Sequence, residues 1–105
     1  MASSVSYLEK PWLKFYQKGV AEHINYEEIC LPDVLVRNAL RYPDKPALIY
    51  MGKEINFARL KEMVDRFAAC LYDFGIRKGD SVAILLPNMI PCVVAYYAIL
   101  KIGAI

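Results

Sequence analysis

The side chains that could act as nucleophiles, bases or metal ligands are few and widely spaced. His23 is the only histidine, the chain has no threonine, and three of its four serines lie within the first six residues. A catalytic triad needs a base beside its nucleophile, so this pattern argues against nucleophilic catalysis. The adjacent carboxylates Glu27 and Glu28 lie in an irregular stretch, where we expect solvated charges. We therefore assign no catalytic residue.

The cysteines do not form a metal-binding pattern. Cys30, Cys70 and Cys92 are separated by 40 and 22 residues, without a C-x-x-C pair, and His23 lies seven residues before Cys30. We therefore expect no metal site and predict buried or half-buried free thiols in a reducing compartment. Residues 1–10 lack the basic region and apolar core of a secretory signal. A cytoplasmic location is expected, with membrane association left open.

Two further features of the sequence could indicate a ligand-binding site. Gly75 and Gly79 are the closest pair of glycines, but Asp80 follows them where a phosphate-binding loop would have lysine and serine or threonine. We interpret them as a helix cap and a turn. Asn88 follows an apolar run, at the strand end where open α/β sheets bind ligands. Because asparagine there also suits the start of a helix, we favour a capping role for Asn88 and assign no cofactor-binding residue.

The composition excludes several classes of protein. The chain has 105 residues, 57% of them hydrophobic, and 13 basic against 11 acidic residues give a net charge of +2. These values exclude intrinsic disorder and give no sign of an electrostatic nucleic-acid binder. Residues 82–105 contain only Asn88 and Lys101 as strongly polar side chains. Such a stretch must be buried against a larger protein, a partner or a bilayer, and we expect a chain truncated at its C-terminus.

The spacing of apolar residues predicts alternating helices and strands after an arm over 1–30. The predicted elements are a helix from Leu31 to about Tyr42, a hairpin over 47–56, a helix over 57–74, a strand over 81–86, a helix over 89–102 and a strand beginning at Ala104. This order predicts an α/β fold with βαβ alternation. The nearly all-apolar strand over 81–86 is expected to be buried on both faces of a parallel sheet.

Individual residues indicate where these helices end and which of their sides face the core. Leu31, Leu35, Ala39 and Leu40 are expected to face inward and Arg37 and Arg41 outward. In the long helix, Asn56 is predicted to cap the N-terminus and Gly75 the C-terminus, with an ion pair between Glu62 and Arg66. The apolar run Val82–Leu100 is long enough for a membrane span, but Pro87, Asn88 and Pro91 interrupt it, which argues against one.

Four segments resemble AMP-forming acyl-CoA synthetases. Residues 43–49 read P-D-K-P-A-L-I, residues 71–88 resemble the signature L-x-x-x-G-v-x-K-G-D-x-V-a-i-l-l-p-N, and residues 95–104 resemble the run a-i-L-K-x-G-A. Pro11–Tyr16 with Gly19 and Val20 is similar to the opening of long-chain fatty acid:CoA ligases. One position departs from the family, because Arg59 stands where a capping box T-Y-x-E-L has an acid.

The resemblance implies ATP-dependent activation of a fatty acid to an acyl-adenylate, followed by thioester formation with CoA, with Mg²⁺ on the phosphates. The family's nucleotide-binding motifs have no counterparts in residues 1–105, so the chain resembles an arm (1–30) and the start (31–105) of the large N-terminal domain of an AMP-binding acyl-CoA ligase. We expect it to bind no cofactor, to be inactive alone and to need the remainder of a parent chain. A homodimer and a peripheral membrane contact are left open. The alternative is a non-enzymatic interaction or membrane-docking segment.

Overall fold

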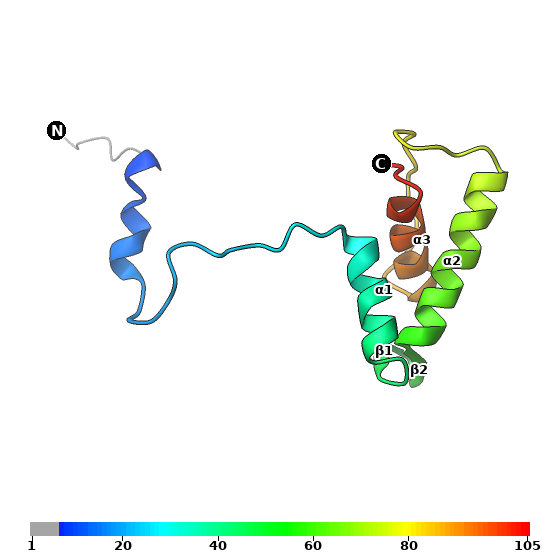
Figure 1. Ribbon diagram of the computed structural model, residues 1–105, viewed down its shortest axis with the longest axis horizontal. Helices are drawn as coiled ribbons and strands as arrows, with labels where there is room; N and C mark the ends of the chain where they lie inside the picture. The colour runs from blue at the N-terminus through cyan, green and yellow to red at the C-terminus, as the bar shows by residue number, and fades with distance from the viewer. Residues whose placement is uncertain (1–6) are drawn as a thin grey trace.

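A computed structural model describes residues 7–105 of the chain, and its body is a group of three helices with a hairpin at one end (Figure 1). Two short 3-10 helices, η1 (Tyr7–Glu9) and η2 (Pro11–Phe15), lie apart from that body and are joined to it by a long link without helix or strand. No residue from 7 to 30 is buried. The first six residues, which belong to the predicted arm and contain three of the serines, lie outside the described residues.

Helix α1 (Leu31–Arg41) begins where the sequence predicts, with Pro32 and Asp33 in its first turn. Leu35 and Ala39 are buried, and Arg37 and Arg41 are exposed, as expected. The inward placement of Leu31 and Leu40 is wrong, because these residues are 49% and 78% exposed. Since α1 packs against α2 and α3 on one side only, its buried face is a narrow stripe that does not reach Leu40.

The predicted hairpin is confirmed as strands β1 (Pro46–Tyr50) and β2 (Lys53–Asn56), paired antiparallel. Met51 and Gly52 form the turn with φ of 49° and 76°. Two residues with positive φ are typical of the type I′ turn that matches the twist of a hairpin, and glycine adopts this conformation without strain. Ile55 on β2 is buried in the core, which attaches the hairpin to the helices.

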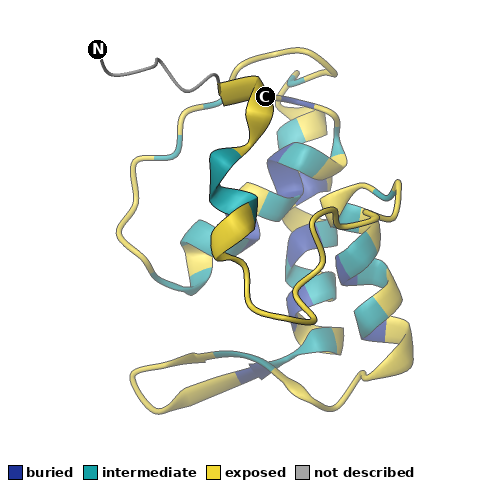
Figure 2. Ribbon diagram, turned by 90° about the vertical axis from the view of Figure 1, so that its left-hand side faces the viewer, coloured by how far each residue is buried: buried dark blue, intermediate teal, exposed yellow. Residues whose placement is uncertain are grey.

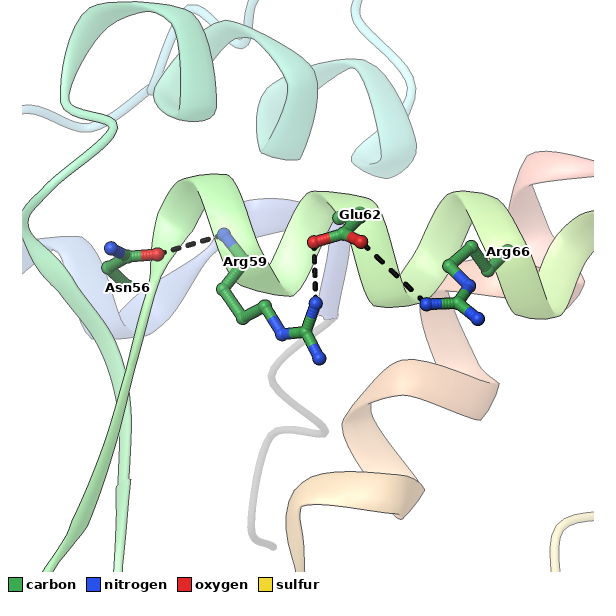
Figure 3. A network of polar contacts seen from close by, with 4 residues as sticks. All are labelled: Asn56, Arg59, Glu62 and Arg66. Carbon is green, nitrogen blue, oxygen red and sulfur yellow. Dashed lines mark hydrogen bonds and ion pairs between the residues drawn. The ribbon is translucent and has the colours of Figure 1, made fainter.

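Both predicted caps of helix α2 (Phe57–Asp73) are confirmed. At the N-terminus, Oδ1 of Asn56 accepts a hydrogen bond of 2.8 Å from the amide of Arg59 (Figure 3). At the C-terminus, Gly75 has a φ of 108° and its amide donates to the carbonyl of Tyr72. The amide of Ile76 donates to the carbonyl of Leu71 at 3.0 Å, which completes a Schellman motif.

A capping box would have an acidic residue at position 59, but this chain has Arg59, which begins a row of charged side chains along α2. Nη1 of Arg59 donates to Glu62 at 2.6 Å, and the predicted partner Arg66 lies 3.8 Å from the same carboxylate (Figure 3). All three side chains are about half exposed or more. Such exposed pairs contribute little to stability, so the cap at Asn56 depends mainly on its own hydrogen bond.

The hydrophobic core lies where α2, α3 (Ile90–Lys101) and α1 meet above the hairpin (Figure 2). Helix α3 is apolar on nearly all sides, but in the described residues only four of its side chains are buried. The buried members of the core cluster come from four elements, α1, β2, α2 and α3, and are Leu35, Ile55, Leu60, Val64, Ala68, Val94 and Ala98.

The prediction of a fully buried strand over 81–86 is wrong. This segment is assigned to no strand, and Leu85 is 98% exposed. Val82 and Ile84 are half-buried while Ser81, Ala83 and Leu85 are exposed, so helices cover one face only. The physical reason is that no neighbouring strand of the described chain lies beside it, and the sheet that the structure does contain is the two-stranded hairpin. The α/β class holds, with three helices and this small sheet.

Over residues 7–105, no helix combines the length and the apolar character that a bilayer crossing requires.

Candidate functional site

The residues that could perform nucleophilic or metal chemistry are dispersed over the structure. His23 is exposed in the link between η2 and α1, and all three cysteines are free. Cys92 is half-buried as predicted, but Cys30 and Cys70 are exposed, so the expectation of buried thiols is wrong for these two. Within the described part of the chain, no group of three or more histidine, cysteine, aspartate or glutamate side chains is placed to hold a metal ion.

Of the paired carboxylates, Glu27 has a structural partner. Nη1 of Arg37 on α1 donates to both carboxylate oxygens of Glu27 at 2.7 Å, and this hydrogen bond together with the negative charge raises the pKa of Arg37. Both glutamates are exposed, as expected for solvated charges, and the Glu27 side chain keeps 62% exposure although it is paired. The ion pair ties the link to α1 and does not form an acid–base couple.

Asn88 lies at the rim of an apolar hollow of about 250 Å³ between the hairpin and the start of α3. The side chain of Asn88 is exposed, and the residue that caps α3 is Met89, which makes no side-chain cap hydrogen bond. The predicted capping role is therefore wrong, because the helix begins one residue later. The hollow is lined by Leu48, Ile49, Tyr50, Asn88, Met89, Ile90, Cys92 and Val93. It can accept an apolar group, but it offers no carboxylate or imidazole for proton transfer.

A pair of asparagine variants tests which cap contributes to stability. Asn56→Ala removes the acceptor for the Arg59 amide and should lower the free energy of unfolding by about 1 kcal/mol, or about 4–8 °C in Tm. Asn88→Ala removes an exposed side chain from an uncapped helix start and should change stability by less than about 0.5 kcal/mol. Thermal unfolding followed by circular dichroism measures both. Equal losses in the two variants would contradict the assignment of the caps.

The two glycine-containing signatures meet in space, although they are more than twenty residues apart. We call this contact between Lys78–Asp80 and Gly103–Ile105 the motif junction. The amide of Gly79 donates to the carbonyl of Gly103 at 3.0 Å, and the amide of Ile105 donates to the carbonyl of Asp80 at 2.7 Å. The amide of Val82 donates to the carbonyl of Ile105 at 2.8 Å. The last two bonds have the pattern of a single parallel bridge between Ser81 and Ile105, on the two sides of α3, although neither segment is assigned to a strand.

The side chains of the motif junction hold its backbone in place. Oδ2 of Asp80 accepts from the amide of Arg77 at 2.7 Å, and the Arg77 guanidinium lies 3.7 Å from the ring centroid of Tyr72. Gly103 has a φ of 76°, and a Cβ atom there would lie 3.0 Å from Cγ of Lys78. These groups are therefore used in shaping a turn, and the glycines do not form a free anion-binding loop.

A cluster of three charges connects α2 to α3 beside the junction. Nζ of Lys61 donates to Oδ2 of Asp65 at 2.6 Å, and Nζ of Lys101 donates to Oδ1 of the same carboxylate. Partial burial acts to raise the pKa of Asp65, but the hydrogen bonds and charges of Lys101 and Lys61 outweigh it and lower the pKa below its usual value. Lys101, part of the K-x-G-A signature, therefore has a structural partner.

The lowered pKa predicts an acid-dependent stability. Because the folded pKa of Asp65 lies below the unfolded one, its contribution is fully present above the unfolded value of about 3.9 and is lost as the pH falls through the folded pKa. With side chains about one-third exposed, the ion pairs should be worth on the order of 1 kcal/mol or less.

The variant Asp65→Asn should therefore be less stable than the unmodified chain at pH 7, and the difference should close at strongly acidic pH. Urea unfolding at a series of pH values measures it. Asp44→Asn, which alters an exposed aspartate in the turn before β1, is the matched control and should show no such gap at neutral pH. A gap for Asp65→Asn that does not change with pH would contradict the electrostatic origin.

Comparison with known proteins shows which family this chain resembles. A family model described as AMP-binding enzyme matches residues 35–105. Long-chain-fatty-acid--CoA ligase of Bacillus subtilis is 35% identical over 97 residues, covering 92% of this chain and 17% of that protein. Acetyl-coenzyme A synthetase 2 of Zygosaccharomyces bailii is 45% identical over 75 residues, covering 66% of this chain and 11% of that protein.

Among solved structures, the N-terminal subdomain of Klebsiella oxytoca NpsA superposes with a TM-score of 0.70 and 33% sequence identity, over 72% of this chain and 20% of that one. The chain thus spans about a sixth of the length of the long-chain ligase that it matches. The signatures that meet in the motif junction lie within the matched region of residues 35–105. The chain belongs to the family of AMP-binding enzymes.

Proposed function

We propose that this chain is the N-terminal portion of an ATP-dependent long-chain fatty acid:CoA ligase. The complete enzyme would convert a fatty acid, ATP and CoA into acyl-CoA, AMP and diphosphate through an acyl-adenylate. The observation that carries the proposal is the share of the chain that each similar protein covers. The match to the long-chain ligase covers 92% of the chain, whereas the match to the acetyl-coenzyme A synthetase covers 66%.

Residues 7–105 offer neither a phosphate loop for ATP nor a carboxylate cluster for Mg²⁺. A phosphate loop needs free backbone amides, but the amides of Gly75, Gly79 and Gly103 donate to carbonyls of the chain itself. Mg²⁺ prefers carboxylate oxygens and water, and residues 7–105 contain no cluster of carboxylates placed for it. We therefore assign no step of the reaction to these residues and expect the reactants to bind to the remainder of the parent chain.

The role that the geometry supports is that of a scaffold. Backbone hydrogen bonds join residues 80–82 to Ile105, which lie on the two sides of α3 in the chain. The ion pair between Lys101 and Asp65 holds α3 against α2 and so keeps these two segments in place. In α/β proteins, ligands bind at the carboxyl ends of parallel strands. Residues 81–86 would therefore contribute one strand to a larger sheet, with Asn88 at the end that faces the ligands.

Two measurements test the proposal. The source gene should encode, after codon 105, a loop rich in glycine, serine and threonine followed by lysine. If no such loop follows, the ligase assignment is wrong and a non-enzymatic interaction segment is the remaining candidate. The purified 105-residue chain should also show no fatty-acid-dependent exchange of ATP and pyrophosphate above the protein-free background, whereas the Bacillus subtilis ligase serves as the positive control. Exchange by the chain alone would contradict its role as a scaffold.

A further inference from the structure

The link between η2 and α1 is attached to the helices by one charged contact (Figure 1). Residues 16–28 are all exposed, and Ile29 is the first half-buried residue before α1. Among the side chains of residues 16–28, only that of Glu27 forms an ion pair or hydrogen bond with a helix of the described chain. It accepts from Nη1 of Arg37 through both carboxylate oxygens at 2.7 Å.

The position of Arg37 determines the side of α1 on which the link is held. Leu35 and Ala39 are buried, and Arg37 lies two residues from each, which is about 200° around the helix. Arg37 is therefore on the face opposite the core, which we call the outer face of α1. Long side chains on a helix point back towards its N-terminus, so the guanidinium can reach Glu27 ahead of the first turn. The amide of Ile29 donates to the carbonyl of Glu27 at 2.9 Å and forms a tight turn between the ion pair and the helix.

We propose that the ion pair between Glu27 and Arg37 is a strap that holds the link on the outer face of α1 and opens when Arg37 exchanges Glu27 for Asp33. Asp33 lies four residues before Arg37 on the same helix, a spacing at which opposite charges pair across a helix surface. It is exposed and forms no ion pair in the described part of the chain. Opening frees the link and the two 3-10 helices to move relative to α1.

An exposed ion pair is strong enough for this role because little else holds the link. Such pairs contribute little to the stability of a whole domain. Here the pair competes only with local opening, and the free energy of local opening is small for a segment without buried side chains. Salt weakens both pairs of Arg37, and the open state also gains the conformational entropy of the link. High ionic strength should therefore open the strap.

Limited proteolysis with chymotrypsin tests the strap. A cut after Tyr26 requires the residues on both sides to detach and extend, which the closed strap at Glu27 opposes, whereas a cut after Tyr16 lies eleven residues away. Arg37→Gln should raise the initial rate of the first cut relative to the second by about two- to fivefold. The matched control is Arg41→Gln, which removes the same charge one turn further along α1 and should leave the ratio unchanged. Mass spectrometry distinguishes the fragments, and circular dichroism verifies that the variants are folded.

The exchange of partners predicts a change in the opposite direction. Asp33→Asn removes the competing acceptor and should lower the ratio of the two cuts by about 1.5- to 2-fold. Raising the salt concentration from about 0.1 M to about 1 M should raise the ratio for the unmodified chain and leave that of Arg37→Gln unchanged. The exchange rate of the Ile29 amide, followed by NMR, should rank the same variants in the same order without a protease.

A ratio that Arg37→Gln leaves unchanged, or that Arg41→Gln raises as much, would overturn the strap. A ratio that Asp33→Asn does not lower would overturn the exchange of partners. The inference goes beyond the proposed function and does not rest on it, because the strap is measured on the 105-residue chain and the ligase assignment on the coding sequence after residue 105.

Discussion

Leu60→Ala is expected to lower the free energy of unfolding by about 2–5 kcal/mol. The Leu60 side chain is 3% exposed and belongs to the core cluster with Val64 of α2 and Val94 and Ala98 of α3. Its truncation removes apolar area from the one place where the hairpin and the helices share a core and leaves a cavity that the neighbouring helices can fill only in part. Since small domains have a total stability of only about 5–15 kcal/mol, the variant should be largely unfolded at a moderately raised temperature.

Leu40→Ala is the matched control, because it makes the same chemical change on α1 at a side chain that is 78% exposed. Its effect should stay within about 0.5 kcal/mol. Urea unfolding monitored by circular dichroism measures both variants, and the slope with denaturant should be similar in the two. A loss for Leu40→Ala as large as that for Leu60→Ala would mean that α1 is covered on its outer side, contrary to the structure.

The contrast between the buried Leu60 and the exposed Leu40 shows which features of the helices could be predicted from the sequence. The spacing of apolar residues locates both helices, because a period of 3.6 residues is a property of the local chain. The width of the buried stripe depends on how many neighbours a helix has. Helix α1 packs against α2 and α3 on one side, so Leu35 is buried and Leu40 is not.

Local chemistry explains which features were predicted correctly. The cap at Asn56, the Gly75 cap and the hairpin predicted over 47–56 depend on residues within a few positions of one another. Contacts between distant positions were not predicted. Lys101 binds Asp65 across 36 residues, and Glu27 binds Arg37 from a link that lacks periodicity. No local pattern distinguishes these charges from solvated ones.

The same distinction applies to the candidate site. The resemblance identified the K-G-D and K-x-G-A segments as signatures, and the structure shows that they bind each other in the motif junction. Strand-like composition over 81–86 predicted a central strand, yet pairing on both sides requires strands that residues 7–105 do not supply. Asn88 was placed correctly at the end of that segment, but the start of α3 at Ile90 removed its capping role.

Gly103→Ala should destabilise the chain by about 2 kcal/mol, through two separable effects at the motif junction. The first is the backbone, because a φ of 76° is strained for a residue with a side chain. The second is the contact with Lys78, whose Cγ and Cβ would lie 3.0 and 3.3 Å from the new methyl group. These two atoms are close to the backbone of a turn that Asp80 and Arg77 hold in place, so they can move little.

Two further variants separate the strain from the contact. Gly79→Ala also introduces a side chain at positive φ, 90°, but no atom lies within 4 Å of the added methyl group. It should therefore cost about 1 kcal/mol, the backbone part alone. In a Lys78→Ala background, the cost of Gly103→Ala should fall to the same value, since the side chain that covers Gly103 has been shortened. If the cost of Gly103→Ala is unchanged in that background, the Lys78 contact does not select glycine at position 103 and the positive φ alone accounts for the residue.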